Sequence, residues 1–371
     1  EVIDVGALDG TPRPMPVVEP DDLSEIMFTS GTTGAPKGAM LRHGTTTHVF
    51  TTYVEILGLA RGDRYLIVNP FFHTFGLKAG ILACLLTGAT MVPMATLDLL
   101  VAMATIERER ITTLPGPPTL YQTLLDHPDL AAHDLSSLRL AVTGAAMVPV
   151  ELIRRMRQEL TFTTILTGYG LTESTGVVTM CRRDDDVETI ATTSGRAIPG
   201  VELRVVASDG TPQPPGSPGE VLVRGYNVMA GYHGDAEATT SAIDPDGWLH
   251  TGDVGVLDER GNLRITDRTK DMFIVGGFNA YPAEIENMIM RHPAVAQVAV
   301  IGTPDDRLGE VGMAFVVPRR NATIDPAALV EWCRGEMANY KVPRQVRVVD
   351  ALPLNAAGKV LKYELRKEAS R

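Results

Sequence analysis

The sequence predicts an α/β protein with a layered, largely parallel sheet, followed by a small antiparallel unit and an α+β unit. Three observations lead to this prediction. From Ser24 to about Met180, apolar strand-like runs alternate with segments of helical spacing, the pattern of a layered α/β unit. From Ser194 to Asp267, short strands are separated by Gly, Pro and Asp turns. From Met272 onward, strands mix with helices again.

The first unit is expected to hold the sheet strands and the helices between them. Residues 1–22 are Pro-rich and acidic and are predicted to be a linker. Strands are predicted at SEIMF (24–28), YLIVNPFFH (65–73), TTLPGP (112–117), LRLAVTGAA (138–146) and TTILTGYG (163–170). Helices are predicted at LDLLVAMATIERE (97–109) and VPVELIRRMRQEL (148–160). Thr, Pro and Asp residues interrupt the apolar stretch Gly80–Ala104, which indicates a buried helix–turn–helix rather than a membrane span.

The two later units are predicted from shorter runs. VELRVV (201–206), GEVLVRG (219–225) and GNLRIT (261–266) indicate a small antiparallel barrel or sheet. The last unit is expected to contain the strands QVAVIG, GMAFVVP and QVRVVD and the helices AEIENMIMRH and PAALVEWCRGEMANY. CRRDDDVET (181–189) is predicted to be a solvated surface turn, although its three aspartates also raise the alternative of a metal site.

Composition limits the classes of partner. The chain has 371 residues, is 44% hydrophobic and carries a net charge of −11. This length favours two domains or more, and the negative charge argues against broad binding to nucleic acid or to anionic membranes. The three cysteines, Cys84, Cys181 and Cys333, lie far apart without zinc spacing, which favours a reduced, cytoplasmic setting. The chain shows no signal peptide and opens at Glu1, so we expect that its true N-terminus is missing.

TSGTTGAPKG (29–38) has the composition of an anion-binding loop. Glycines let backbone N–H groups approach a phosphate, the hydroxyls of Thr29, Ser30, Thr32 and Thr33 add donors, and Lys37 adds a positive charge. The segment does not match the G-x-x-x-x-G-K-[ST] pattern, because Ala35 and Pro36 follow Gly34. A standard P-loop is therefore disfavoured, and a flexible linker is the alternative.

Five further segments must be considered together with this loop. They are TGYGLTES (167–174), GWLHTGDVG (247–255), TDRTKDMFIVGGFNAYPAEIE (266–286), YKVPRQV (340–346) and LPLNAAGKVLKYELR (352–366). In this order, and over nearly the whole chain, the six segments resemble the adenylate-forming superfamily of acyl-CoA synthetases, luciferases and peptide-synthetase adenylation domains. One such loop alone would be weak support, whereas six in order are specific.

The resemblance implies a luciferase-like fold with an α/β sheet subdomain at 23–190 and a β-barrel-like subdomain at 191–269. Together these form an adenylation core over residues 1–269. A small, mobile α+β lid domain follows at 270–371, with its hinge at Lys270. From the resemblance we also expect that the family's N-terminal part, roughly 150 residues or about one domain's length, is not included in this chain.

The resemblance also implies a two-step ligase that uses ATP, Mg²⁺ and coenzyme A. A carboxylate attacks the α-phosphate of ATP to give acyl-adenylate and pyrophosphate, and a thiol then displaces AMP. In such an enzyme the opening loop would cover the β- and γ-phosphates. The implied loop residues are Thr29, Ser30, Gly31, Thr32, Thr33, Gly34 and Lys37.

The remaining nucleotide contacts are also carried over from the family. Tyr169 would stack on adenine between Gly168 and Gly170, Thr172 would bond the α-phosphate, and Glu173 would hold Mg²⁺, which prefers oxygen ligands. A second set of contacts serves the ribose, where Asp253 would accept hydrogen bonds from both hydroxyls with Arg268 assisting.

The acyl pocket and the C-terminal domain complete the implied site. Gly144 and Ala145 would form the wall beside adenine and the acyl chain, and His73 with Phe75, in PFFHTFG, would gate the acyl pocket. For His73 and Gly144 ordinary core packing is the alternative.

Lys359 would bridge the acyl carboxylate and the α-phosphate, where charge develops. Gly276 and Gly277 would leave a channel open for the thiol.

The favoured function is an acyl-CoA synthetase for a hydrophobic acid, a fatty acid or a ring-bearing alkanoate. FHTFGLKAG resembles synthetases of fatty-acid and steroid-ring catabolism in actinobacteria, and Lys78 in it is expected near the pocket mouth, where it could meet an oxygenated acid. Two alternatives stay open: transfer of the acid to a carrier protein, and a nucleotide-binding regulator without catalysis. The resemblance also suggests a homodimer, and acetylation and deacetylation of Lys359.

Overall fold

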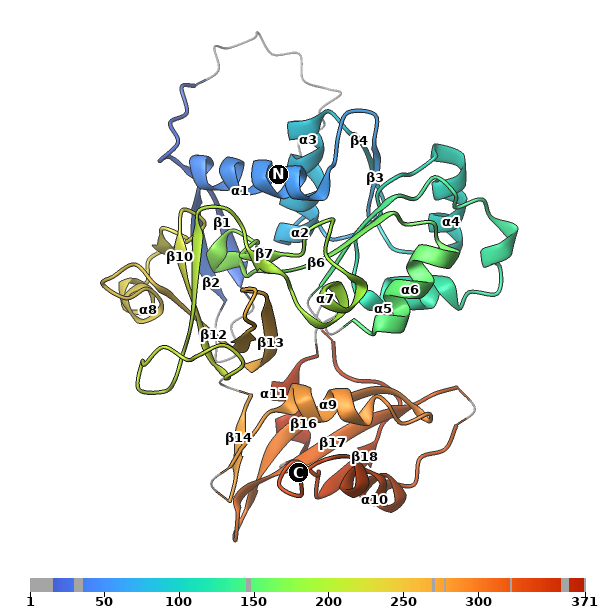
Figure 1. Cartoon of the computed structure of the whole chain (residues 1–371), viewed down its shortest axis with the longest axis vertical. Helices are drawn as coiled ribbons and strands as arrows, with labels where there is room; N and C mark the ends of the chain where they lie inside the picture. Colours follow the sequence, from blue (N-terminus) through green and yellow to red (C-terminus); the bar gives the residue numbers. More distant parts are fainter. Residues whose placement is uncertain are drawn as a thin grey trace.

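The computed structural model of the protein describes residues 16–29, 36–144, 148–268, 271–276, 278–320, 322–354 and 360–369. Of Asp267, Arg268 and Asn279 it describes the backbone alone. Figure 1 shows that the elements from β14 (Phe273–Val275) onward form a group of strands and helices separate from the rest of the chain.

A mixed, mostly parallel sheet lies in the first part of the chain. β3 (Arg64–Ile67) pairs in parallel with β4 (Thr90–Pro93), and β5 (Leu140–Gly144) pairs in parallel with β6 (Thr164–Tyr169). Parallel bridges from Thr113 to Tyr65 and Leu140 join the two pairs. The short strands β7 (Thr179–Met180) and β8 (Arg196–Ala197) continue the sheet in antiparallel pairing. The predicted largely parallel sheet is confirmed.

Helices cover both faces of this sheet. Figure 1 shows α1 (His43–Leu57) and α3 (Ala83–Thr87) on one side, and α4 (Leu99–Glu109), α5 (Pro118–Leu125) and α6 (Val150–Glu159) on the other. The short helix α7 (Val187–Thr192) follows β7. Crossovers between parallel strands are right-handed. When the sheet grows from one strand in both directions, the crossover helices of the two directions therefore lie on opposite faces of the sheet.

Two smaller sheets complete the first 268 residues. β1 (Leu23–Thr29), β2 (Lys37–Arg42) and β11 (Gly231–Tyr232) form an antiparallel sheet. β9 (Val201–Val206), β10 (Gly219–Gly225), β12 (Leu249–Leu257) and β13 (Leu263–Arg268) form another in the order β13-β12-β10-β9, with α8 (Ala236–Ala242) beside it. This sheet confirms the predicted antiparallel unit. Its Trp248 lies between the guanidinium groups of Arg204 and Arg224, at 4.2 and 4.6 Å from the ring centroid.

The C-terminal unit has a sheet and hydrophobic clusters of its own. Its strands are β14 (Phe273–Val275), β15 (Phe278–Ala280), β16 (Val295–Asp305), β17 (Gly309–Pro318) and β18 (Gln345–Val348). Its helices are α9 (Pro282–Ile289), α10 (Pro326–Glu336) and α11 (Lys362–Ala369). Leu329 and Val300 belong to one cluster, and Phe315 and Leu365 to another. Trp332 packs edge-on against the ring of His292 at 5.1 Å. The predicted α+β pattern is confirmed.

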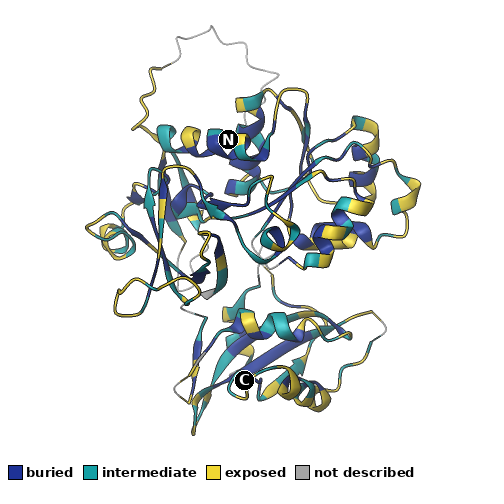
Figure 2. Cartoon of the chain, viewed as in Figure 1, coloured by how far each residue is buried: buried dark blue, intermediate teal, exposed yellow. Residues whose placement is uncertain are grey.

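Burial follows this division into clusters. Figure 2 shows the buried residues along the sheets and along the inner faces of the helices. The main cluster runs from Met27 to Leu263 and contains buried residues of α1, β3, β5 and β6. The described residues contain no helix that is long and apolar enough to cross a membrane.

Three local predictions were wrong. The stretch 80–104 is not a helix–turn–helix, because Thr90–Pro93 between the helices forms β4 and pairs with β3. The strand predicted at 65–73 ends at Ile67. The strand predicted at 112–117 contributes only the bridges of Thr113, because Pro115 and Pro117 have no N–H to donate to a ladder.

Candidate active site

Two predicted nucleotide residues meet between the parallel sheet and the antiparallel sheet. Tyr169 is the last residue of β6, and Asp253 lies in β12 with its side chain buried at 3% exposure. The Tyr169 hydroxyl donates a hydrogen bond to Oδ2 of Asp253 at 2.6 Å. The Asp253 N–H also donates to Oγ1 of Thr251 at 3.1 Å, within the part of β12 where its pairing with β10 shifts register. These residues, 84 positions apart, therefore share one site.

A second contact brings a predicted metal ligand to the strand beside the opening loop. Thr172 and Glu173 lie in the 3₁₀ helix η4 (Thr172–Ser174). Oε1 of Glu173 accepts a hydrogen bond from the Tyr232 hydroxyl at 2.9 Å, and Nζ of Lys37 lies 5.0 Å from the centroid of the Tyr232 ring. Burial raises the pKa of Tyr232, and the charge of Glu173 raises it further, so the phenol stays a donor.

Sequence reasoning missed Tyr232. It lies in the two-residue strand β11, which pairs with Ala39 and Met40 of β2. No motif contains it, and its neighbours in the chain are Gly231 and His233. The only signal available was an aromatic residue after a glycine, which is too common to predict a site. The three-dimensional pairing of β11 with β2 is what brings its hydroxyl to Glu173.

Close backbone approach explains the glycines at this edge of the sheet. Gly144 and Gly168 are partners at the carboxyl ends of β5 and β6, and a Cβ on Gly144 would lie 2.7 Å from the Gly168 oxygen. A Cβ on Gly170 would lie 2.2 Å from the Gly176 oxygen. Both positions therefore exclude larger residues for reasons of packing. The same packing leaves the ends of two parallel strands side by side, the usual location of a ligand in such sheets.

His73 and Phe75 lie at the start of α2 (Thr74–Gly76). Nδ1 of His73 accepts a hydrogen bond from the N–H of Phe75 at 3.2 Å, and the exposed imidazole therefore caps this short helix. Phe75 is half-buried against the main core. Oγ1 of Thr74 donates to Sδ of Met27 at 3.4 Å, which joins this segment to β1. The gating role of His73 and Phe75 stays a prediction.

The prediction that Lys78 lies at the pocket mouth is wrong. Lys78 is buried, at 1% exposure, in the π-helix η2 (Leu77–Leu82) that follows α2. Its Nζ forms an ion pair with Oε1 of Glu25 and donates to Oγ1 of Thr46 at 3.1 Å. An amine paired in this way inside the protein does not face an entering acid.

Of the remaining predicted residues, three lie in the described part of the chain and the others lie outside it. Thr29 and Lys37 are opposite each other at the end of the β1–β2 hairpin, and Oγ1 of Thr29 donates to the Lys37 carbonyl at 3.4 Å. Gly276, in the turn after β14, donates its N–H to the Leu308 carbonyl at 2.8 Å. The predicted residues outside the described ranges are Ser30, Gly31, Thr32, Thr33, Gly34, Ala145, Lys270, Gly277 and Lys359, together with the side chain of Arg268.

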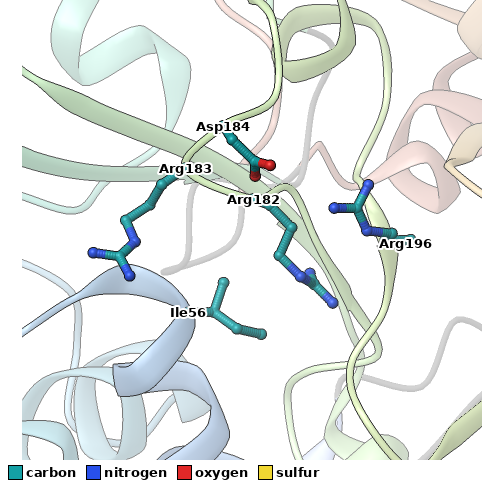
Figure 3. Close-up of a pocket in the computed structure, with 5 residues that line it drawn as sticks. All are labelled: Ile56, Arg182, Arg183, Asp184 and Arg196. Atoms are coloured by element: carbon teal, nitrogen blue, oxygen red, sulfur yellow. The ribbon is translucent and has the colours of Figure 1, made fainter.

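A hollow of about 500 Å³ lies away from the predicted site residues. Figure 3 shows the side chains that line it. It is lined by Ile56, Arg182, Arg183, Asp184 and Arg196. Arg182 donates to the carbonyl oxygens of Met180 and Ala197, and Arg196 pairs with Asp185 at 3.5 Å. Two of the three guanidinium groups are therefore already engaged within the protein, and we assign no ligand to this hollow.

The aspartates of CRRDDDVET have local roles. Asp185 accepts a hydrogen bond from the N–H of Arg182 at 2.6 Å, and Asp186 caps α7 by accepting from the N–H of Thr189 at 2.7 Å. Within the described ranges, no group of three or more His, Cys, Asp and Glu side chains could hold a metal ion. The surface-turn interpretation of this segment agrees with these contacts.

Comparisons with known proteins agree on one family. The family model described as AMP-binding enzyme matches residues 3–233, and the one described as AMP-binding enzyme C-terminal domain matches residues 284–359. A protein of Rhodococcus jostii, named as a CoA ligase for a propanoyl group on a methyl-dioxo-octahydroindenyl ring system, is 56% identical over 351 residues. The match covers 95% of this chain and 66% of that protein.

Two further relatives extend this result. A protein of the same name from Mycobacterium tuberculosis is 56% identical over 361 residues, 97% of this chain and 69% of that protein. The solved structure of ATP-bound MatB from Rhodopseudomonas palustris is 36% identical, with a TM-score of 0.86, over 94% of this chain and 69% of that one. The chain therefore spans about two thirds of the length of the curated relatives that it matches.

Proposed function

Because the chain belongs to the family of AMP-binding enzymes, we propose that it is a ligase that activates a hydrophobic carboxylic acid with ATP and transfers it to coenzyme A. The observation that carries the proposal is the contact between Tyr169 and Asp253, which joins two predicted nucleotide-binding segments at the carboxyl edge of the parallel sheet. The contact of Glu173 with Tyr232, beside Lys37, supports a phosphate site next to it.

In the first proposed step, a carboxylate oxygen of the acid attacks the α-phosphorus of ATP, and the bond to pyrophosphate breaks. Lys37 and the hydroxyls and backbone N–H groups of residues 29–34 neutralise the departing pyrophosphate. Thr172 donates to the α-phosphate, and Lys359 stabilises the negative charge that develops between acid and phosphate. Such preorganised charges are commonly the largest contribution to catalysis.

In the proposed complex, the residues assigned to the nucleotide hold the adenosine. Tyr169 presents its ring to the adenine beside Gly144, Ala145, Gly168 and Gly170. Asp253 and Arg268 bind the ribose, and Arg268 lies opposite Asp253 in the β12–β13 ladder. A carboxylate can accept from two hydroxyls at once, and bonds to a charged acceptor are the stronger ones.

Mg²⁺ fits this site as an ion held mainly by the substrate. Glu173 is the carboxylate proposed to hold the ion, and its Oε1 is oriented by the Tyr232 hydroxyl. Mg²⁺ in ATP sites is typically bound by one or two carboxylates, phosphate oxygens and waters, so a large protein cluster is not required. When bound, the ion would neutralise phosphate charge.

In the second step, the thiol of coenzyme A attacks the acyl carbon and AMP leaves. We propose that residues 1–269 form the adenylation core and that residues 270–371 form a lid that turns about Lys270. Gly276 and Gly277 would then line the thiol channel. The separate hydrophobic clusters of the C-terminal unit support this division.

The acid that we propose is a ring-bearing alkanoate, with a fatty acid as the second choice. The curated relatives at 56% identity are named for a propanoyl group on a fused ring system, and their names specify CoA as the acceptor. CoA is therefore favoured over a carrier protein. The free, buried cysteines and the use of ATP suit the reducing cytoplasm.

ATP–pyrophosphate exchange with a panel of acids tests the proposal. The panel contains acetate, laurate, cinnamate, an amino acid and a propanoate on a saturated fused ring. We expect exchange to be fastest with the ring-bearing propanoate, and thioester to form when coenzyme A is added. Nucleotide binding without exchange for any acid would instead indicate a regulator, and exchange without thioester would indicate a different acceptor.

A further inference from the structure

A buried group of three polar side chains joins the segment of the proposed acid pocket to the strand of the proposed phosphate loop. Lys78 lies in η2, Glu25 in β1 and Thr46 in α1. Nζ of Lys78 pairs with Oε1 of Glu25 and donates to Oγ1 of Thr46 at 3.1 Å, while Oγ1 of Thr46 donates to Oε1 of Glu25 at 3.2 Å. Each member of the Lys78–Glu25–Thr46 group therefore contacts the other two.

The positions of these residues connect two parts of the site. Glu25 lies four residues before Thr29, where β1 ends and the loop begins, and Lys78 lies five residues after His73. A second contact runs in parallel, because Thr74 of α2 bonds Met27 of β1 at 3.4 Å. A Cβ on Gly176 would lie 2.2 Å from Cγ2 of Thr74, so α2 also packs closely against the loop that follows η4.

Stability alone does not explain why the chain buries this cation. Burial lowers the pKa of Lys78, and the hydrogen bond and charge of Glu25 act against that shift without reversing it. An apolar pair of similar volume commonly stabilises a protein as well as a buried ion pair does. A directional polar contact does differ from an apolar one in fixing the relative position of two elements. The π-helix that carries Lys78 is also rare and is found frequently at functional sites.

We propose that the Lys78–Glu25–Thr46 group is a positioning contact that makes the acid-pocket wall and the phosphate-loop strand shift together, so that acid and ATP bind cooperatively. The inference rests on the proposed function, because it names a regulation of that site. An acid that settles against His73 and Phe75 would hold α2 and η2 in one position. Through Glu25, β1 would then hold the hairpin end at Thr29 and Lys37 in the position that favours ATP binding, and linkage requires the reverse effect to be equal.

The test measures cooperativity of binding rather than turnover. The affinity for an ATP analogue with a methylene group between the α- and β-phosphates is measured by calorimetry. Each titration is run with and without the panel acid that supports the fastest exchange. In the natural protein we expect the acid to tighten analogue binding at least about fivefold, the lower end of typical coupling. In Lys78→Met/Glu25→Leu we expect less than about a twofold effect, with the analogue alone still bound.

Two further variants serve as a second test and as a control. Thr46→Val removes the hydroxyl that bridges the two charges but keeps the shape, so it should lose part of the cooperativity even if the double variant does not fold. Arg64→Met/Glu109→Leu removes an ion pair of 2.6 Å at the amino end of β3 and should keep the full cooperativity.

Three outcomes would overturn the proposal. The natural protein and the Lys78 and Thr46 variants could show equal cooperativity, the natural protein could show none, or the Arg64 control could lose as much cooperativity as the Lys78 variant. If the natural protein does not bind the analogue under any condition, the proposed function itself fails.

Discussion

At the scale of single residues, the contact of Tyr169 with Asp253 is the part of the site with the clearest consequence. Asp253 is almost completely buried, yet it lies beside the ends of β5 and β6 that are proposed to hold the nucleotide. A buried carboxylate needs hydrogen-bond donors, and in this structure the phenol of Tyr169 provides one. A ligand hydroxyl that reaches the same carboxylate would therefore meet a group that is already desolvated.

Replacement of Asp253 by alanine is expected to weaken ATP binding. Each lost hydrogen bond to a charged acceptor is worth about 1.5–3 kcal/mol, or roughly a ten- to a hundredfold in affinity. Calorimetry with ATP measures the change. Tyr169→Phe, which keeps the ring but removes its hydroxyl, should have a smaller effect. Asp246→Ala, in an exposed turn, should have none. Unchanged affinity in Asp253→Ala would contradict the ribose assignment.

Replacement of Glu25 by glutamine is expected to make stability depend more strongly on pH. Without the carboxylate, the pKa of Lys78 falls further below its ordinary value, because burial then acts without opposition. A lysine whose pKa is lower in the folded state destabilises the fold while it is protonated. This loss is complete below the folded-state pKa, shrinks as the pH rises above it, and disappears once the pH passes the ordinary pKa of lysine. Near neutral pH the variant should lose about 3 kcal/mol, a value typical of breaking a buried pair.

Urea unfolding from about pH 7 to about pH 10 measures this effect on both proteins. The difference in free energy of unfolding between natural protein and variant should shrink as the pH rises. A difference that stays constant over this range would show that Lys78 does not titrate in the folded state, and a difference that grows would have the wrong sign.

At the scale of elements, α11 provides a local control for the proposed role of Lys359. Lys359→Ala should slow adenylate formation by roughly a hundredfold or more, because a fixed cation is lost where charge develops. The same variant should convert premade acyl-adenylate to thioester at a near-normal rate. Lys367→Ala, an exposed lysine in α11, should leave both steps unchanged. Single-turnover assays of each step decide the matter, and an equal loss of both steps in Lys359→Ala would contradict its assigned role.

The elements that could be predicted from the sequence are those whose pattern is evident within one short segment. VELRVV and GEVLVRG became β9 and β10 with unchanged bounds, because Gly, Pro and Asp turns separate these short apolar runs within the sequence itself. β4 was missed because four residues between two apolar helical runs carry no period of their own, and only the pairing with β3 makes them a strand. Tyr232 and the inward position of Lys78 were missed for a similar reason. The partners Glu173 and Glu25 are distant in the chain.

At the scale of the whole molecule, the hydrophobic clusters indicate more than one folding unit. The main cluster includes Leu166, and a separate cluster in the C-terminal unit includes Leu329. Both side chains are almost completely buried, at 0% and 1% exposure. Units with separate cores commonly unfold separately.

We expect two calorimetric transitions. Leu329→Ala should reduce the free energy of unfolding of the C-terminal unit by about 2–5 kcal/mol and so lower the temperature of its transition. Leu166→Ala should do the same for the unit that contains the main cluster. If each variant shifts a single shared transition, the two clusters unfold together.

The positions of the two tryptophans allow these units to be observed separately with light. Trp248 lies between two guanidinium groups in the antiparallel sheet, and Trp332 touches an imidazole in the C-terminal unit. A Trp→Phe change at either position leaves one tryptophan per molecule, whose emission can be excited selectively over that of the tyrosines. The chain thus carries two built-in optical reporters, by which movement or melting of each unit can be recorded without an attached dye.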